Sequence, residues 1–167
     1  YLAHEFSCDM DKVKENLYNF LGANRRYQIL YDTDIKIIDD YAHHPTEITA
    51  TIKAAKKIEN GKIIAVFQPH RYSRTNFFLN EFAESLKEAD EILLLPIYSA
   101  EEENIYNVSS EKLAELVGKN AKVYSDQEIM QIVEENKDCA NIYLFMGAGS
   151  ISKIANDIKN KLVGEIK

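Results

Sequence analysis

The sequence is poor in the residues that build disulfide scaffolds and flexible linkers. Its 167 residues include two cysteines, three prolines, six glycines and no tryptophan. Cys8 and Cys139 lie far apart and belong to no CxxC or other metal-type spacing, so we expect two reduced thiols in a cytoplasmic protein. No apolar run approaches the length of a membrane span, and no charged-then-apolar leader is present, so we expect no membrane partner.

Positive charge is scarce as well. Asp and Glu number 27 against 20 Lys and Arg, which gives a formal net charge of −7. Binding to a phosphate backbone requires a basic face, so we expect no nucleic-acid partner. The remaining composition, 46% hydrophobic and 28% charged, is typical of a globular protein, and the length suits one domain with its own core.

The first forty residues change from a helical to a strand pattern. The chain begins at Tyr1, without Met and within a pattern, so we expect a piece of a longer protein. Apolar spacing predicts a helix over residues 10–21, which Gly22 ends. Strands over 27–31 and 35–39 then flank a predicted hairpin turn.

From residue 40 onward, helical and strand patterns alternate. Helices are predicted over 46–58, 75–87 and 109–117, from a capping box at 125–128, and over 151–158. Strands are predicted over 63–67, 92–97, 121–124 and 142–146. This alternation indicates an α/β fold with a Rossmann-like, mostly parallel sheet, one antiparallel edge strand from the hairpin, and helices on both faces.

Residues suited to anion binding concentrate in a few loops. Ligands of such sheets bind beyond the carboxyl ends of the parallel strands, which here means the loops 40–45, 68–75, 98–107 and 147–150. Sixteen of the twenty basic residues are scattered lysines, whereas the arginines form two clusters, Arg25-Arg26 and Arg71 with Arg74. Clustered arginine favours a planar grip on carboxylate or phosphate.

The segment His70–Thr75, read as HRYSRT, is the densest of these clusters. Either arginine taken alone would more often be a surface ion-pair former. Their occurrence together with His70, directly after a buried strand and at the start of a helix, favours an anion site instead, because free amides and the helix dipole attract negative charge there.

The segment 39–47, read as DDYAHHPTE, could suggest a metal site. Adjacent histidines point in different directions, and no HExxH spacing is present, so we expect no metal here. We expect one carboxylate to accept hydrogen bonds from a ribose or amine and one imidazole to meet a phosphate. His44 is expected to be structural, and Thr46 is predicted to cap the following helix.

Two further segments offer weaker indications. A GxGxxG fingerprint that begins at Gly147 would need its third glycine at position 152, where the sequence has Ser152. We therefore exclude a dinucleotide site. The segment Gly147-Ala148-Gly149 is then expected to form a tight turn that presents backbone amides. Residues 98–103 are acidic and are expected to form a solvated loop.

Two motifs carry a resemblance to a known family. Residues 39–47 and 67–75 (FQPHRYSRT) resemble the C-terminal domain of the Mur ligases of peptidoglycan synthesis, in particular the members that join L-alanine to UDP-N-acetylmuramate. Segments 22–27, 97–100 and 146–149 support it, although Asn24, Glu101 and Ser150 depart from the family pattern. The resemblance implies that residues 1–24 are the last helix of a preceding central ATPase domain with the junction, and that residues 25–167 are the C-terminal domain.

The resemblance also implies an ATP-dependent, amide-forming ligase that acts through an acyl phosphate. It assigns nucleotide binding to Arg25, Asp40 and His43, a catalytic position to His43, and the amino-acid pocket to Tyr41, His70, Arg71 and Arg74. The partners implied are ATP with magnesium, L-alanine and UDP-N-acetylmuramate. The chain contains no GxxxxGKS/T motif, so the metal ligands are expected mainly in the central domain and this chain alone is expected to be inactive.

Two other functions remain open at this point. One is a ligase that attaches a whole peptide to the same sugar nucleotide during wall recycling, which shares the HHPT loop. The other is a stand-alone nucleotide-binding module without chemistry of its own.

Overall fold

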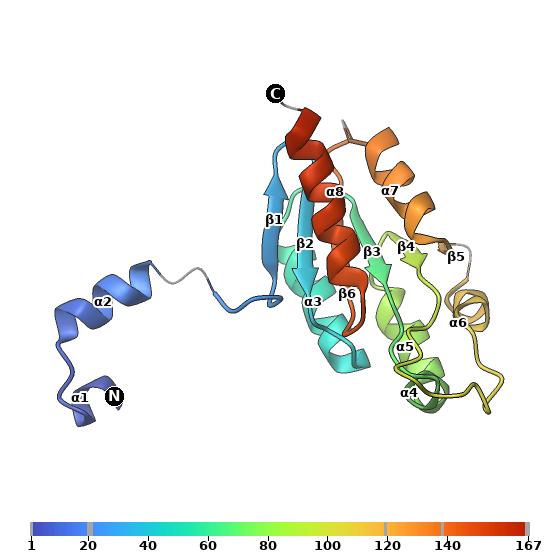
Figure 1. Ribbon diagram of the computed structural model, residues 1–167, viewed down its shortest axis with the longest axis horizontal. Coiled ribbons are helices and arrows are strands. Elements are labelled where there is room, and N and C mark those ends of the chain that lie inside the picture. Colours follow the sequence, from blue (N-terminus) through green and yellow to red (C-terminus); the bar gives the residue numbers. More distant parts are fainter. Residues whose placement is uncertain (1, 20–21, 119, 138, 166–167) are drawn as a thin grey trace.

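A six-stranded sheet forms the centre of the protein, with helices on both faces (Figure 1). The computed structural model describes residues 2–19, 22–118, 120–137 and 139–165. The strand order is β1-β2-β6-β3-β4-β5, with β1 antiparallel to β2 and the other four pairs parallel. The predicted α/β fold with one antiparallel edge strand is therefore confirmed.

The elements follow the predicted alternation closely. The strands are β1 (Gln28–Asp32), β2 (Lys36–Asp40), β3 (Ile63–Phe67), β4 (Glu91–Leu94), β5 (Ala121–Val123) and β6 (Ile142–Met146). The helices are α1 (Leu2–Glu5), α2 (Met10–Tyr18), α3 (Pro45–Ile58), α4 (Tyr72–Phe77), α5 (Leu79–Leu86), α6 (Ser110–Val117), α7 (Asp126–Glu135) and α8 (Ile151–Glu165).

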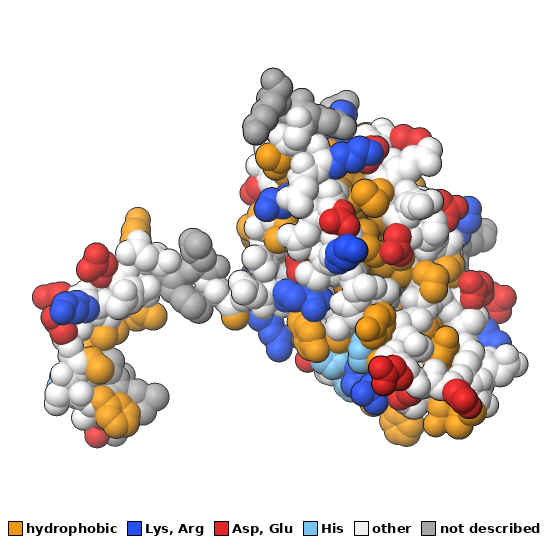
Figure 2. All heavy atoms as spheres, viewed as in Figure 1, with side chains coloured by type: hydrophobic (Ala, Val, Ile, Leu, Met, Phe, Trp, Pro, Cys, Tyr) orange, Lys and Arg blue, Asp and Glu red, His pale blue; other side chains and the backbone are white. Residues whose placement is uncertain are grey.

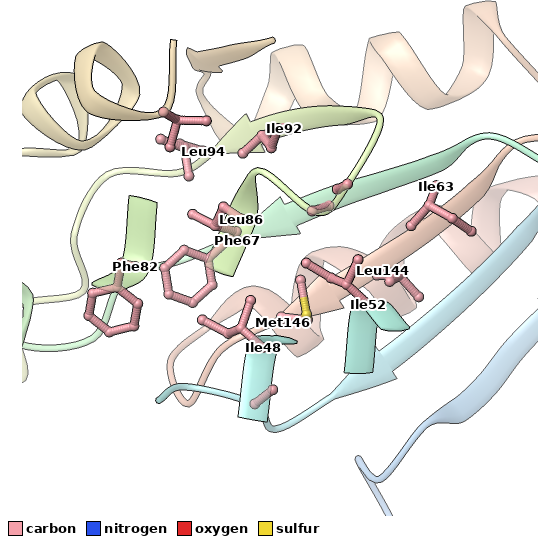
Figure 3. Packing of buried hydrophobic residues seen from close by; sticks show 14 of the residues in the cluster. Ile48, Ile52, Ile63, Phe67, Phe82, Leu86, Ile92, Leu94, Leu144 and Met146 are labelled. Atoms are coloured by element: carbon pink, nitrogen blue, oxygen red, sulfur yellow. The ribbon is translucent and has the colours of Figure 1, made fainter. Parts of the chain in front are cut away.

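Both faces of the sheet are buried, which explains why its central strands are continuously apolar. All five residues of β3 and of β6 are buried. Ile63, Ala65 and Phe67 of β3 pack toward α3, α5 and α6, whereas Ile64 and Val66 pack toward α7 and α8. Figure 3 shows the first of these layers, in which the central-strand residues meet the following side chains of α3 and α5: Ile48, Ile52, Phe82 and Leu86.

Helix α3 begins earlier than the sequence predicted. The N-cap is His44 in extended conformation, so the prediction of Thr46 as the cap is wrong. Pro45 occupies the first turn, where its missing N–H costs nothing. The His44 ring accepts the Thr46 amide, and the Glu47 carboxylate accepts the His44 amide, which completes a reciprocal capping box.

The predicted helix over 75–87 is two helices. Helix α4 starts at Tyr72, and the helix is interrupted at Phe78, whose φ of −109° and ψ of 23° are not helical. The Phe78 ring contacts His44 edge-on at 4.7 Å between centroids. The predicted strand over 92–97 ends at Leu94, shortly before Pro96, which has no N–H to donate to a ladder.

Helices α1 and α2 form an arm that extends away from the sheet (Figure 1). Asp9 caps α2, yet α2 has no buried residue. Phe6, Leu17 and Tyr18 are 77%, 68% and 91% exposed, and apolar side chains are visible along the arm in Figure 2. The predicted helix over 10–21 ends at Tyr18; residues 20 and 21 lie outside the described residues. Among the helices of the described ranges, none is long and apolar enough to cross a membrane.

Candidate functional site

The four loops expected at one edge of the sheet do meet there, beyond the carboxyl ends of β2, β6 and β3. The Gly147 amide donates to the Asp40 carbonyl at 3.3 Å, and the Arg71 amide donates to the Tyr98 carbonyl at 2.8 Å. His70 and Tyr98 also form a parallel bridge. Figure 2 shows histidine and basic side chains gathered at the corresponding lower edge. This edge is the candidate site.

Arg25, which precedes β1, contacts three residues at this edge. Its Nε lies 3.3 Å from an Asp39 carboxylate oxygen, and its Nη2 donates to the Gly147 carbonyl. Its guanidinium lies 4.9 Å from the Tyr41 ring centroid, a cation–π distance. Its φ of 56° is unusual for a residue other than glycine. Three neighbours thus fix a side chain that is 24% exposed, leaving Nη1 without a partner among the described residues.

The two adjacent aspartates at the end of β2 perform different tasks. Asp39, 1% exposed, accepts from Ser152 Oγ at 2.5 Å in addition to its contact with Arg25. Asp40, 7% exposed, accepts the Tyr27 amide at 2.7 Å and the Ala42 amide at 2.8 Å. Asp40 therefore holds the loop in shape, and only the remaining lone pairs of its carboxylate are open to a ligand.

His43 has a defined orientation. Its Nδ1 lies 3.0 Å from the Tyr41 carbonyl and 3.3 Å from a Glu47 oxygen, and both are acceptors. Nδ1 therefore carries the proton in the neutral ring, which leaves the lone pair on Nε2. Burial disfavours the charged form of Glu47, but hydrogen bonds from the His43 and His44 amides and the charges of His43 and Arg26 together lower the Glu47 pKa. An ionised Glu47 beside Nδ1 keeps this tautomer.

His70 is a partly buried imidazole of the edge. It stacks on the Tyr98 ring at 5.4 Å with an interplanar angle of 12°, and its Nδ1 is buried without a hydrogen-bond partner in the described part of the chain. Burial, together with the charges of Arg74, Arg71 and His43, lowers the His70 pKa. His70 is therefore neutral at pH 7.

The two arginines of the HRYSRT segment differ in their surroundings. Arg71 is half exposed, with a φ of 72°, and its Nη1 lies 3.4 Å from Glu102. Arg74 is partly buried, and its side chain forms no ion pair or hydrogen bond with the residues that the structure describes. Burying a charge is favourable only when the charge is paired, so the guanidinium of Arg74 is free to take an anionic partner.

The Gly147–Gly149 turn brings β6, β3 and the Tyr98 loop close together. A Cβ on Gly147, at φ 151°, would lie 2.8 Å from the Gln68 carbonyl. A Cβ on Gly149 would lie 2.5 Å from the Gln68 side-chain oxygen, which accepts the first amide of α8, that of Ile151. The Gly147 amide and the first amide of α8 thus join the turn to β2 and to the segment after β3, which closes the edge.

Three residues of this edge were missed by sequence reasoning: Asp39, Gln68 and Glu102. Glu102 was expected to be solvated, but it accepts both the amide and the hydroxyl of Ser73 at 2.8–3.0 Å. These hydrogen bonds and the charge of Arg71 lower the Glu102 pKa. Sequence gave no signal for it, because its partner lies 29 residues away.

The described residues contain no metal-binding cluster, and two sizeable hollows lie away from this edge. No group of three or more His, Cys, Asp or Glu residues among those described is arranged to hold a metal ion. Hollows of about 590 Å³ between α6 and α7 and 750 Å³ between α3 and α5 lie elsewhere. The groups that this edge offers for chemistry are the guanidinium groups of Arg74 and Arg71, which could accept an anion, and the Nε2 lone pair of His43, which could accept a proton.

Comparison with known proteins places these features in a family. Residues 25–149 match the family described as "Mur ligase, glutamate ligase domain". The chain is 42% identical to UDP-N-acetylmuramate–L-alanine ligase of Fusobacterium nucleatum, over 98% of the chain and 38% of that protein. It is 43% identical to the enzyme of the same description from Carboxydothermus hydrogenoformans, over 92% of the chain and 33% of that protein.

Solved structures agree. UDP-N-acetylmuramate-alanine ligase from Thermotoga maritima has a TM-score of 0.74 at 30% identity, covering 98% of this chain and 36% of that one. A murein peptide ligase from Psychrobacter arcticus has a TM-score of 0.63 at 26% identity, covering 89% and 32%. The chain thus spans about a third of the length of these relatives. On its sequence match and its fold, the chain belongs to the Mur ligase family.

Proposed function

We propose that this chain is the C-terminal part of an ATP-dependent ligase that joins L-alanine to UDP-N-acetylmuramate in the cytoplasm. In this reaction ATP phosphorylates the muramate carboxylate. The amine of alanine then attacks the acyl phosphate, so that a C–N bond forms, a C–O bond to phosphate breaks, and the amine loses a proton. The chain supplies the amino-acid pocket and part of the nucleotide site.

The observation that carries this proposal is the unpaired, partly buried Arg74 beside a neutral His70. A small amino acid offers little apolar area, so its carboxylate must supply most of the affinity. Arg74 and Arg71 would grip that carboxylate, with Tyr41 and His70 as the walls of the pocket. His70 would not compete with the two arginines for the carboxylate at pH 7, because its lowered pKa keeps the ring neutral.

The nucleotide would approach the edge from the side of Arg25. Arg25 would contact its phosphates through Nη1, the nitrogen that its protein contacts leave open. Asp40 would meet the ribose hydroxyls with its remaining lone pairs. This support is weaker than that for Arg74, since two backbone amides already occupy the Asp40 carboxylate.

His43 is the candidate for proton transfer. Its Nε2 lone pair, left open by the Nδ1 contact with the Tyr41 carbonyl, would accept the proton that the attacking amine loses. The ligands of the ATP-bound magnesium would lie mainly in residues outside this chain, and the proton transfer at His43 does not depend on them.

In this proposal the chain consists of two parts. Residues 1–24 would complete a preceding ATPase domain, which would cover the exposed apolar residues of the arm. Residues 25–167 would form the C-terminal domain. The chain alone should show no ATP-dependent ligation, and ligation by the purified chain would contradict this division.

The wall-recycling ligase is the second candidate. The 26% identity to a murein peptide ligase supports it less than the 42% identity to alanine ligases. The third candidate is a stand-alone nucleotide-binding module. If the chain were such a module, it should bind ATP alone with micromolar affinity. If it is part of the ligase, it should bind ATP only when the rest of the protein is supplied.

Ligation by the full-length parent tests the proposal, with Arg74→Ala against wild type at saturating ATP and UDP-N-acetylmuramate. Loss of a charge-assisted hydrogen bond of about 1.5–3 kcal/mol should raise the KM for alanine about 10–100-fold. Lys57→Ala, an exposed cation on α3, is the control and should change nothing. An unchanged KM in Arg74→Ala would place the amino-acid pocket elsewhere.

A further inference from the structure

Glu102 reaches from the acidic loop, residues 98–107, to the start of α4. Its two carboxylate oxygens accept the Ser73 amide at 3.0 Å and the Ser73 hydroxyl at 2.8 and 3.0 Å, and one lies 3.4 Å from Arg71 Nη1. The side chain is 24% exposed. A single carboxylate thus joins the loop to both a backbone donor and a cation of the HRYSRT segment.

The start of α4 needs this partner. Its N-cap, Arg71, has a left-handed φ of 72° and makes no side-chain capping hydrogen bond. The Ser73 amide would have no acceptor within its own helix, because the first turn of a helix leaves its amides free. Glu102 supplies the cap from a distant loop and so fixes the backbone that carries Arg71.

The two arginines of the segment differ in whether an acidic residue pairs with them. Glu102 restrains the guanidinium of Arg71, a long side chain that is half exposed and would otherwise sample many rotamers. Arg74 is left without a counter-charge among the described residues. Arg71 is therefore held in place, whereas the charge of Arg74 stays available to a ligand.

The two residues before Glu102 have a strained backbone conformation. Ala100 and Glu101 both have left-handed φ values, 50° and 67°, although neither is glycine. The Glu102 amide donates to the Ser99 carbonyl at 3.2 Å, which closes the turn. Strain of this kind persists only where surrounding contacts enforce it. Here the contacts include those of Glu102 with Ser73 and Arg71, together with the backbone hydrogen bonds that join Tyr98 to Pro69 and to Arg71.

We propose that Glu102 is a positioning residue that holds Arg71 in the orientation that binds the carboxylate of the incoming amino acid. This inference rests on the proposed function. Glu102 acts on the substrate only through Arg71, and its negative charge, rather than its ability to accept the Ser73 amide, is what orients the guanidinium.

The variant Glu102→Gln separates these two roles. The glutamine oxygen still accepts the Ser73 amide, but the charge facing Arg71 is lost. In the full-length parent we expect the KM for alanine to rise about tenfold, equivalent to about 1.4 kcal/mol, with kcat within about twofold and the melting temperature unchanged. Glu103→Gln, an exposed neighbour in the same loop, is the matched control and should behave as wild type.

A double-mutant cycle tests whether the effect passes through Arg71. In an Arg71→Ala background, Glu102→Gln should raise the KM no further. Additive effects of the two substitutions would overturn the proposal, as would an unchanged KM in Glu102→Gln. A fall in melting temperature with kcat and KM lowered by the same factor would show that Glu102 acts only as a helix cap. That result would also overturn the proposal.

The outcomes separate this inference from the proposed function. A wild-type parent that ligates another amino acid but not alanine contradicts the substrate, and the same variants then test Glu102 through the KM for that amino acid. A parent that ligates no amino acid overturns both. Alanine ligation with a normal KM in Glu102→Gln overturns the inference alone.

Discussion

Replacement of Asp39 by Asn should destabilise the domain strongly, although the two side chains have the same shape. Asp39 is 1% exposed and lies 3.3 Å from Arg25 Nε. Two unit charges at this distance interact by about 5 kcal/mol at an effective dielectric constant of about 20. Removal of one partner of a buried pair costs about 3–5 kcal/mol, because the other charge stays buried.

Two features of Arg25 reduce this figure. Its side chain is 24% exposed, so water can solvate part of the unpaired charge. It also keeps the Gly147 carbonyl and its contact with the Tyr41 ring, and the latter contributes about 0.5–1 kcal/mol. We therefore expect Asp39→Asn to lower the free energy of unfolding by about 2–3 kcal/mol. For a chain of this length the melting temperature should fall by about 4–12 °C.

Urea unfolding of this chain, followed by circular dichroism, measures the loss directly. With a slope of about 2 kcal/mol/M the midpoint should fall by about 1–1.5 M. Asp34→Asn, in the exposed hairpin turn, is the control and should leave the midpoint within error. A loss below about 0.5 kcal/mol in Asp39→Asn would show that the ion pair does not anchor Arg25 and would refute the expected destabilisation.

Three further results are expected from the same unfolding assay. The pKa of His70 is lowered in the folded state, mainly by burial, so its stabilising contribution is present above about pH 6.5 and is lost as the pH falls through the lowered, folded-state pKa. His70→Gln should flatten this loss of stability below about pH 6.5. Glu101→Gly should stabilise by about 0.5–1 kcal/mol by relieving its left-handed φ, whereas Glu103→Gly should destabilise, and equal effects would refute the strain argument. Gly149→Ala should cost about 1–3 kcal/mol, because the added Cβ would meet the Gln68 side-chain oxygen at 2.5 Å; a neutral result would mean that the turn yields easily.

The parts of the fold that follow from local pattern were predictable. Burial on both faces makes β3 and β6 continuously apolar, and helical spacing marks α3, α7 and α8, so the α/β class and the shared edge of the four loops could be derived. The errors lie where two local rules compete. Thr46 is an acceptable cap, but Pro45 prefers the first helical turn and moves the cap to His44.

The supporting contacts of the candidate site could not be derived. Asp39 meets Ser152 across 113 residues, and Glu102 meets Ser73 across 29. Such pairs depend on how loops from different strands come together, which the spacing along the sequence does not encode. The clustering of arginine and histidine therefore predicted that these groups gather at one edge of the sheet, but not which acidic residues hold them in place.

The position of β6 has a consequence for how the protein is made. This strand is the last of the six in the sequence, yet it lies between β2 and β3 at the middle of the sheet. On the ribosome, the loops after β2 and β3 cannot be brought to their final spacing until residue 146 has emerged. Before that point both strands present open edges, which are prone to pair with other chains. Nascent chains that stall before β6 should therefore depend on chaperones, and the loops of the candidate site should come together only once that last strand has been inserted.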